Sequence, residues 1–259
     1  MNYLSKVYLT VLAPVTLLTA GLSYASAALA GDIFTPNAAQ QVELGKRAAA
    51  DLRQSHHVLP ASDWRVQALH DVAHHLLGVT DLNGAPWKFS FDVIESNEVN
   101  AFALPGGPVF FYTGLFAKLH TEDELAGVLG HEMTHVLKEH WAKAYGEKLK
   151  RDLGIAVILS LLHAGHSLVD LANISDELLF TLPNSRGAES EADDGGFTRM
   201  IAAGYNPQGE ADVFQMLANL GGNAPEWLSD HPDSAHRVAR IKQKILDSHR
   251  NYSPQKPLH

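Results

Sequence analysis

The chain has 259 residues and a formal net charge of −9, and 46% of its residues are hydrophobic and 19% charged. This is the composition of a globular protein with one sizeable core, and the acidic balance excludes nucleic acid as the expected partner. The absence of cysteine excludes disulfides, a cysteine nucleophile, thiolate metal ligands and a lipid-modified cysteine.

The first thirty residues have the pattern of an export signal. Lys6 is followed by an apolar run and then by small residues that end in Ala28-Leu29-Ala30. We therefore predict a signal peptide over residues 1–30, with Ala25-Ser26-Ala27 as a second candidate cleavage site, and a mature domain over residues 31–259. Export without cysteine favours a bacterial periplasm, and a retained N-terminal membrane anchor is the alternative.

Two helices are expected at the start of the mature domain. Thr35-Pro36 can begin a helix that runs to about Arg53, and Ser62-Asp63 can begin one that runs to about Leu77. Beyond them the apolar residues alternate, which predicts three short strands, in the segments WKFSFDVI, VNAFAL and PVFFYTG.

The second half of the chain is predicted to be helical. Thr121 and Glu124 form a capping box before one long helix, LAGVLGHEMTHVLKEHWAKAY. The apolar segment LGIAVILSLL is too short to cross a bilayer, so it predicts a buried helix, with a membrane-adjacent one as the alternative. Further helices are expected at about 185–203, ending at Gly204, and from near Pro232 to about Arg250, with a frayed tail after Asn251.

The segment His131-Glu132-Met133-Thr134-His135 carries the chemistry of the chain. Two histidines four residues apart stand on one helical face, where both can bind one zinc ion. Glu132 lies beside them and can act as a general base. A chance match among 15 histidines is the alternative, but the capped amphipathic context disfavours it. His70, His74 and His75 have similar spacing without such context and predict a polar helix face.

A catalytic zinc site also needs a third protein ligand. A histidine six residues after His135 is excluded because that position is Trp141, and the apolar stretch downstream offers no nearby glutamate. The remaining candidates are Glu189 and Asp193, four residues apart on the later helix, of which one can bind the metal while the other hydrogen-bonds an imidazole. A solvated acidic helix face is the alternative reading of this cluster.

Four motifs follow one another along the chain: NAFALPGG at 100–107, HEMTH at 131–135, SRGAESEAD at 185–193, and His231-Pro232 followed by Arg237. In this order they resemble the HtpX-like and CAAX-prenyl-protease-related zinc metallopeptidases, and among them the soluble, BepA-like periplasmic branch. The resemblance implies a zinc ion held by His131, His135 and Glu189, with Asp193 supporting the site and Glu132 as base. It also implies that His231 occupies the open metal position at rest or, with Arg237, stabilises the oxyanion.

The resemblance further implies how a substrate is bound. The strand containing Asn100, Ala101, Phe102 and Ala103 corresponds to an edge strand to which an extended polypeptide adds as another strand. Such weakly selective binding suits unfolded or misassembled envelope proteins as substrates. Association with other envelope proteins or with the membrane surface is a further expectation.

We therefore predict an α+β, mainly helical, single-domain zincin-like endopeptidase, with a small sheet beside the helix of the HEMTH motif and one Zn2+ per chain. A rival function is a chaperone-like protein that binds unfolded polypeptides next to a latent, self-blocked zinc site. A structural or storage zinc site is disfavoured because it has little use for Glu132.

Overall fold

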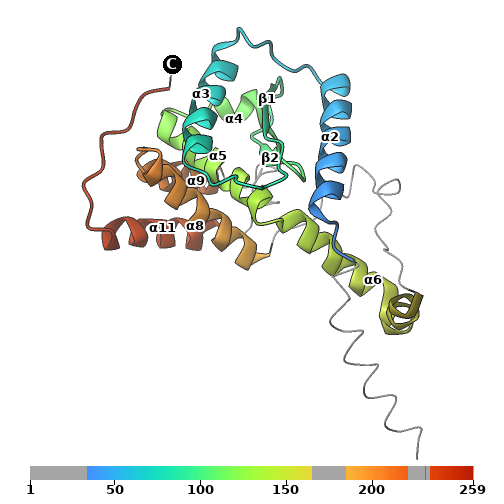
Figure 1. Cartoon of the computed structure of the whole chain (residues 1–259). Helices are drawn as coiled ribbons and strands as arrows, with labels where there is room; N and C mark the ends of the chain where they lie inside the picture. Colours follow the sequence, from blue (N-terminus) through green and yellow to red (C-terminus); the bar gives the residue numbers. More distant parts are fainter. Residues whose placement is uncertain (1–33, 165–184, 221–230, 232–233, 259) are drawn as a thin grey trace, which may run out of the picture.

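A computed structural model of the chain describes residues 34–164, 185–220, 231 and 234–258. Within these residues the fold is α+β and mainly helical, as predicted (Figure 1). The helices are α2 (Ala38–Ser55), α3 (Trp64–Gly78), α4 (Thr113–Phe116), α5 (Glu122–Leu137), α6 (His140–Ala164), α8 (Arg186–Ala202), α9 (Gln208–Asn219) and α11 (Ser234–Asp247), and the strands are β1 (Ser90–Ile94), β2 (Ala101–Ala103) and β3 (Pro108–Tyr112). The predicted signal peptide lies outside the described residues.

The first two described helices begin at polar caps. Asn37 accepts a hydrogen bond from the backbone of Gln40, whose side chain bonds back to Asn37, so α2 begins slightly later than Thr35-Pro36 predicted. Asp63 caps α3 as predicted, with 2.9 Å between its carboxylate and the backbone nitrogen of Arg65.

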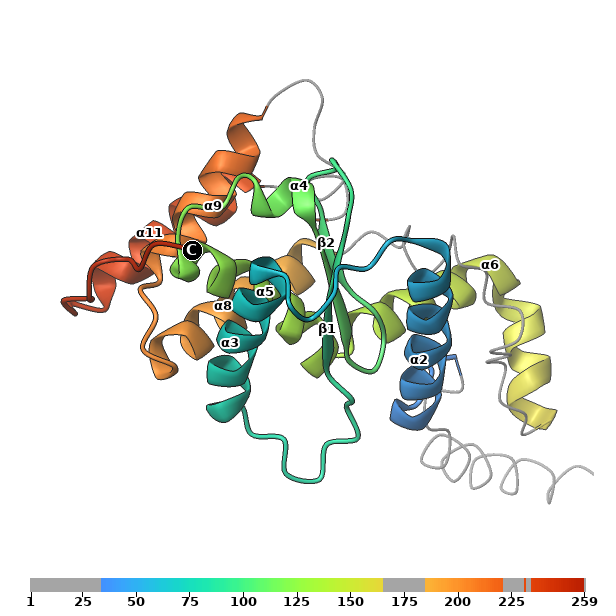
Figure 2. The same ribbon diagram turned by 90° about the horizontal axis from the view of Figure 1, so that it is seen from above.

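The three predicted strands form one sheet in the described part of the chain, in the order β1-β3-β2. Strand β1 pairs with β3 in parallel and β2 pairs with β3 in antiparallel orientation. Side chains such as Val93 and Phe111 pack with α3 and α5, whereas Ile94 and Phe110 pack with α2. The sheet therefore lies between α2 on one face and α3 with α5 on the other, which Figures 1 and 2 both show.

Helix α5, which carries the HEMTH motif, runs through the core. Both hydrogen bonds of the predicted capping box between Thr121 and Glu124 are present, and every residue from Asp123 to Val136 is buried. Two of its glycines face neighbouring helices at backbone contact distance. A Cβ atom on Gly130 would lie 3.2 Å from Cα of Gly196 in α8. These small residues let α8 approach the motif closely.

The prediction of one long helix through Tyr145 was wrong, because α5 ends at Leu137 and α6 begins at His140. Between them Glu139 has a φ of 55°, a left-handed conformation that costs an L-residue about 1–2 kcal/mol. The buried side chain of Gln41 donates to the Glu139 carboxylate at 2.7 Å and so holds this turn from α2. The break redirects the chain at the C-terminal end of the motif.

The apolar segment LGIAVILSLL is helical, as predicted, and belongs to α6. Its side chains beyond residue 153 lie outside the described part of the structure. Among the helices that the structure describes, none combines the length and the apolar character needed to cross a bilayer.

The later helices agree only partly with the sequence prediction. Helix α8 is capped by Ser185 and ends before Gly204, whose φ of 82° stops it, as expected. Helix α9 was missed, because Asn206-Pro207 was read only as a stop, whereas Pro207 is also the cap residue of the next helix. Helix α11 covers most of the predicted final helix.

The expectation of a frayed C-terminal tail was wrong. The backbone nitrogen of Leu258 donates to the carbonyl of His120 at 3.0 Å, and that of Lys256 donates to the Asp123 carboxylate at 2.8 Å. The Lys256 carbonyl in turn accepts from the nitrogen of Glu122 at 2.8 Å. The tail thus satisfies polar groups at the start of α5, where a helix has unpaired N–H groups.

Candidate metal centre

Helix α5 presents two buried imidazoles to the same point. His131 and His135 are four residues apart in the sequence, and their Nε2 atoms lie 2.9 Å apart. His131 is fully buried and His135 nearly so. Burial, and after it the neighbouring His131 and His231, lower the pKa of His135 well below its usual value. The ring of His135 is therefore suited to offer an unprotonated nitrogen.

Helix α8 brings a carboxylate to the two imidazoles. Glu189 Oε2 lies 3.5 Å from His131 Nε2, and Glu189 Oε1 lies 3.5 Å from His135 Nε2. Burial alone would raise the pKa of Glu189, but the contacts with His231 and His131 outweigh it and hold this pKa well below its usual value. Glu189 is therefore an ionised, buried carboxylate that faces the two imidazoles.

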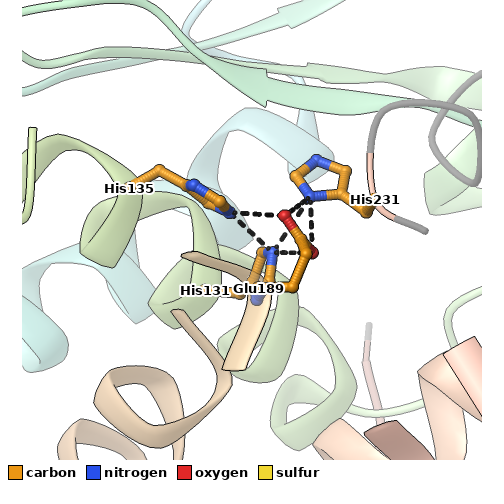
Figure 3. Close-up of side chains that lie close together, drawn as sticks. All are labelled: His131, His135, Glu189 and His231. Atoms are coloured by element: carbon orange, nitrogen blue, oxygen red, sulfur yellow. Dashed lines mark hydrogen bonds and ion pairs between the residues drawn. The ribbon is translucent and has the colours of Figure 1, made fainter. Parts of the chain in front are cut away.

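His231 adds a fourth side chain to the same point. Its Nδ1 lies 3.1 Å from each carboxylate oxygen of Glu189 and 3.1 Å from His131 Nε2. One ligand atom from each of these four residues lies within 4.8 Å of the other three, and Figure 3 shows the side chains pointing toward one another.

The donor set fits a zinc ion. Nitrogen and oxygen ligands placed tetrahedrally at about 2.0–2.1 Å from a zinc ion are roughly 3.3 Å apart. The separations of 2.9 to 3.5 Å among these four side chains bracket that value. These four side chains could therefore hold one metal ion.

Glu132 lies next to this cluster, as its place in the motif predicts. It is buried, and its Oε1 atom is 3.5 Å from Nε2 of His231. The Glu132 carboxylate borders the point on which the four side chains converge, without being one of them.

Asp193 and Arg237 form a layer behind the cluster. Asp193 Oδ1 lies 3.0 Å from His131 Nδ1 and 2.7 Å from Nη2 of Arg237. Arg237 also reaches Glu189 Oε2 at 2.9 Å, and its guanidinium lies over the ring of Phe214 with 4.4 Å to the centroid. Burial alone would raise the pKa of Asp193, but His131 and Arg237 lower it. The oxyanion role expected for Arg237 stays a prediction.

Two residues on the other side of the cluster escaped the sequence analysis. His140 Nδ1 lies 2.9 Å from His135 Nδ1, and His140 Nε2 lies 3.1 Å from Glu191 Oε2. Burial, more than any other influence, lowers the pKa of His140. A histidine five residues after His135 is visible in the sequence, but only the unforeseen break at Glu139 brings it back to the motif.

The three histidines predicted to lie on a polar helix face do so. His70, His74 and His75 are exposed on α3, which confirms a polar helix face. The structure places them in other contacts, such as 2.9 Å from His75 Nδ1 to the hydroxyl of Tyr205.

Strand β2 is at the edge of the sheet in the described residues. Its neighbours Asn100 and Leu104 bond to β3, with 3.0 Å from the Tyr112 nitrogen to the Asn100 carbonyl and 2.7 Å from the Leu104 nitrogen to the Pro108 carbonyl. Because backbone groups alternate along an antiparallel strand, those of Ala101 and Ala103 point to the outer edge. Of the predicted substrate-binding strand, these two residues offer the outward backbone groups.

Comparison with known proteins gives a family. The profile of peptidase family M48 matches residues 63–245. The chain is 30% identical over 226 residues to metalloprotease LoiP of Escherichia coli (strain K12), an alignment that covers 85% of this chain and 86% of LoiP. It is 34% identical over 177 residues to mitochondrial metalloendopeptidase OMA1 of Arabidopsis thaliana, covering 67% of this chain but only 33% of that protein.

A further relative is the β-barrel assembly-enhancing protease of Yersinia pestis, which is 31% identical over 189 residues, covering 68% of this chain and 39% of that protein. The chain thus spans about a third of the plant protein and somewhat more of this protease. These findings confirm the resemblance and the enzyme class predicted from the sequence. The chain belongs to peptidase family M48, a family of metallopeptidases.

Proposed function

We propose that this chain is a zinc-dependent endopeptidase with one zinc ion held by His131, His135 and Glu189. The observation that carries the proposal is the convergence of these side chains, with His231, on one buried point beside Glu132. A bound zinc ion would act as a Lewis acid toward the scissile carbonyl and would lower the pKa of water.

Glu132 is the general base in this proposal. Its carboxylate takes the proton of the attacking water and passes it to the nitrogen of the leaving amine, so that the peptide bond breaks and a carboxylate and an amine form. Asp193 and Arg237 keep the ligands in place, because their contacts reach His131 and Glu189. His231 and Arg237 are the candidates for stabilising the oxyanion, as expected from the sequence.

The outer edge of β2 is the proposed site for the substrate backbone. An extended polypeptide can pair with the outward backbone groups of Ala103, which is partly exposed, whereas Ala101 is buried and is reached only when its neighbours move. Next to them Asn100 is buried, and its Oδ1 atom has no hydrogen-bond partner among the described residues. A polar atom left unpaired beside a binding edge can accept a hydrogen bond from a substrate N–H group.

We propose unfolded or misassembled envelope proteins as the substrates and the periplasm as the location. Backbone pairing favours substrates that can become extended, whatever their sequence. The export pattern of residues 1–30 and a relative named β-barrel assembly-enhancing protease support this choice. Envelope proteins or the membrane surface are the proposed points of association.

A second candidate is a latent site in a chaperone-like protein. The buried His231 contacts both oxygens of Glu189 at 3.1 Å, so it stands where a fourth ligand would close the metal site. A polypeptide could then bind along β2 without being cut until His231 moves away. Replacing His231 would raise the rate of hydrolysis in this case, and would lower it if His231 stabilises the oxyanion.

The test measures the zinc content per chain and casein hydrolysis for the wild type, Glu189→Ala and Glu132→Gln. We expect one zinc in the wild type, weaker binding in Glu189→Ala, and full metal without hydrolysis in Glu132→Gln. Full zinc in Glu189→Ala would show that the third ligand is another residue. Cleavage by Glu132→Gln would exclude Glu132 as the base, and full zinc with an inactive wild type would favour the latent site.

A further inference from the structure

A chain of hydrogen bonds leads from the candidate metal ligand His135 to the protein surface. His135 points its Nε2 atom at the ligand cluster, and its Nδ1 atom lies 2.9 Å from Nδ1 of His140. Nε2 of His140 lies 3.1 Å from the carboxylate of Glu191 on α8. The side chain of His140 is buried, whereas that of Glu191 is 42% exposed.

The acceptors along this chain determine where the protons are. An ionised carboxylate can only accept, so Nε2 of a neutral His140 must donate to Glu191. Nδ1 of His140 then carries no proton and accepts the N–H of His135 Nδ1. The remaining nitrogen of His135, Nε2, is left with a lone pair, and it is the nitrogen that faces His131 and Glu189.

The fold creates this contact at the break between α5 and α6. In an uninterrupted helix, residues five apart are separated by roughly 140° around the axis, so His140 would point away from His135. The left-handed conformation of Glu139 turns the chain and brings the two rings to 4.8 Å between centroids. The same segment provides Lys138, whose Nζ atom holds Glu191 at 2.6 Å.

We propose that His140 and Glu191 are positioning residues for His135, which orient its ring and leave Nε2 in the unprotonated form that binds a metal. Partners on the outer nitrogen of a ligating histidine fix its tautomer and orientation, and their loss costs about 10–100-fold in metal affinity. Asp193 has the equivalent place on His131, so each histidine of the motif has its own carboxylate, directly for His131 and through His140 for His135. The inference rests on the proposed zinc site.

The test is the zinc affinity of the full chain, measured by competition with a chelator. Glu191→Ala removes the carboxylate that accepts a hydrogen bond from His140. We expect the variant to bind zinc about tenfold more weakly. Glu191→Gln keeps an oxygen acceptor and should stay within about threefold of the wild type. Glu147→Ala is the matched control, because Glu147 is an exposed acidic residue of α6 that pairs with Lys150, so its loss should leave the affinity unchanged.

His140 is tested by His140→Leu and His140→Asn. Leucine removes the acceptor for His135 Nδ1, and we expect binding weaker by about 10–100-fold, whereas asparagine places an amide oxygen near the same position and should recover most of the affinity. In the metal-free wild type, the ¹⁵N spectrum of labelled histidine should show His135 protonated at Nδ1, and this form should lose population in His140→Leu and in Glu191→Ala.

The outcomes separate this inference from the proposed function. A wild type that binds no zinc contradicts the metal site itself. The positioning role alone is overturned if the wild type binds zinc and both Glu191→Ala and His140→Leu bind it with the same affinity, with the His135 tautomer unchanged. If His140→Leu fails to fold, the comparison of Glu191→Ala with Glu191→Gln and Glu147→Ala decides the question.

Discussion

Nδ1 of His131 and the carboxylate of Asp193 lie 3.0 Å apart, and both side chains are fully shielded from solvent. The same carboxylate pairs with Nη2 of Arg237 at 2.7 Å and with Nη2 of Arg240 at 2.8 Å. Replacing Asp193 by asparagine keeps the shape but removes the charge that these donors share. We expect Asp193→Asn to bind zinc about 10–100-fold more weakly, as measured by chelator competition.

The neighbouring acidic residue is the control for this prediction. Asp194 is half exposed and pairs with Lys244 at 2.7 Å on the outer side of α8. Asp194→Asn should therefore leave the zinc affinity unchanged. Equal effects of the two substitutions would mean that the net charge of α8, and not the contact with His131, controls the affinity.

Glu210 gives a prediction about pH. This residue of α9 is completely buried, and neither of its carboxylate oxygens has a hydrogen-bond partner among the described residues. Burial, and after it the nearby Asp193, raise the pKa of Glu210 well above its usual value of 4.5. Above pH 4.5 the unfolded chain releases this proton while the folded chain keeps it, so the free energy of unfolding decreases as the pH rises toward the folded-state pKa.

Glu210→Gln removes this titration. The difference in the free energy of unfolding between Glu210→Gln and the wild type should therefore grow in favour of the variant above pH 4.5, by up to about 1.4 kcal/mol for each pH unit, until the pH reaches the folded-state pKa. Denaturant unfolding of both proteins in the presence of a chelator measures it. A difference that does not change with pH would show that Glu210 is ionised in the folded protein.

The close packing of α5 against α9 predicts the effect of adding one methyl group. A Cβ atom on Gly127 would lie 2.7 Å from Cα of Glu210, and backbone cannot yield as a flexible side chain can. We expect Gly127→Ala to lower the free energy of unfolding by about 1–3 kcal/mol. Gly78, at the end of α3, has no atom within 4 Å of such a Cβ, so Gly78→Ala should be neutral or stabilise by up to about 1 kcal/mol.

The proposed substrate edge is tested with proline. The backbone nitrogen of Ala103 points away from β3, so Ala103→Pro removes a donor for the substrate without removing a bond within the sheet. We expect a several-fold higher KM for casein, with the thermal unfolding temperature nearly unchanged. Phe102→Pro is the contrasting variant, because its nitrogen points toward β3 and its loss should destabilise the sheet. An unchanged KM for Ala103→Pro would argue against backbone pairing at β2.

Local signals in the sequence were enough to predict much of this fold. The caps at Asp63 and Thr121, the alternating strands and the stop at Gly204 depend on neighbouring residues, and each was found where expected. The break at Glu139 was not predictable in this way, since the pattern of apolar residues continues through it. It depends on a contact with Gln41, which lies far away in the sequence.

In the candidate site, too, some residues could be predicted from their sequence neighbours and others could not. The spacing of His131 and His135 and that of Glu189 and Asp193 could be read directly, because each pair lies on one helix. His231 and Arg237 came only from the resemblance, since nothing in their own neighbourhood marks them as part of a metal site. His140, Glu191 and Glu210 were missed because their environment is created by the packing of α6, α8 and α9 on α5.

Strand β2 has only three residues, and two of them are alanines. An edge of this kind provides backbone pairing over a short length and few pockets for side chains. In the proposed function, a client protein would be cut in proportion to the time that one of its segments spends extended and unpaired. The lifetime of a client would then follow its own free energy of local unfolding, and the enzyme would compete with folding rather than select a sequence.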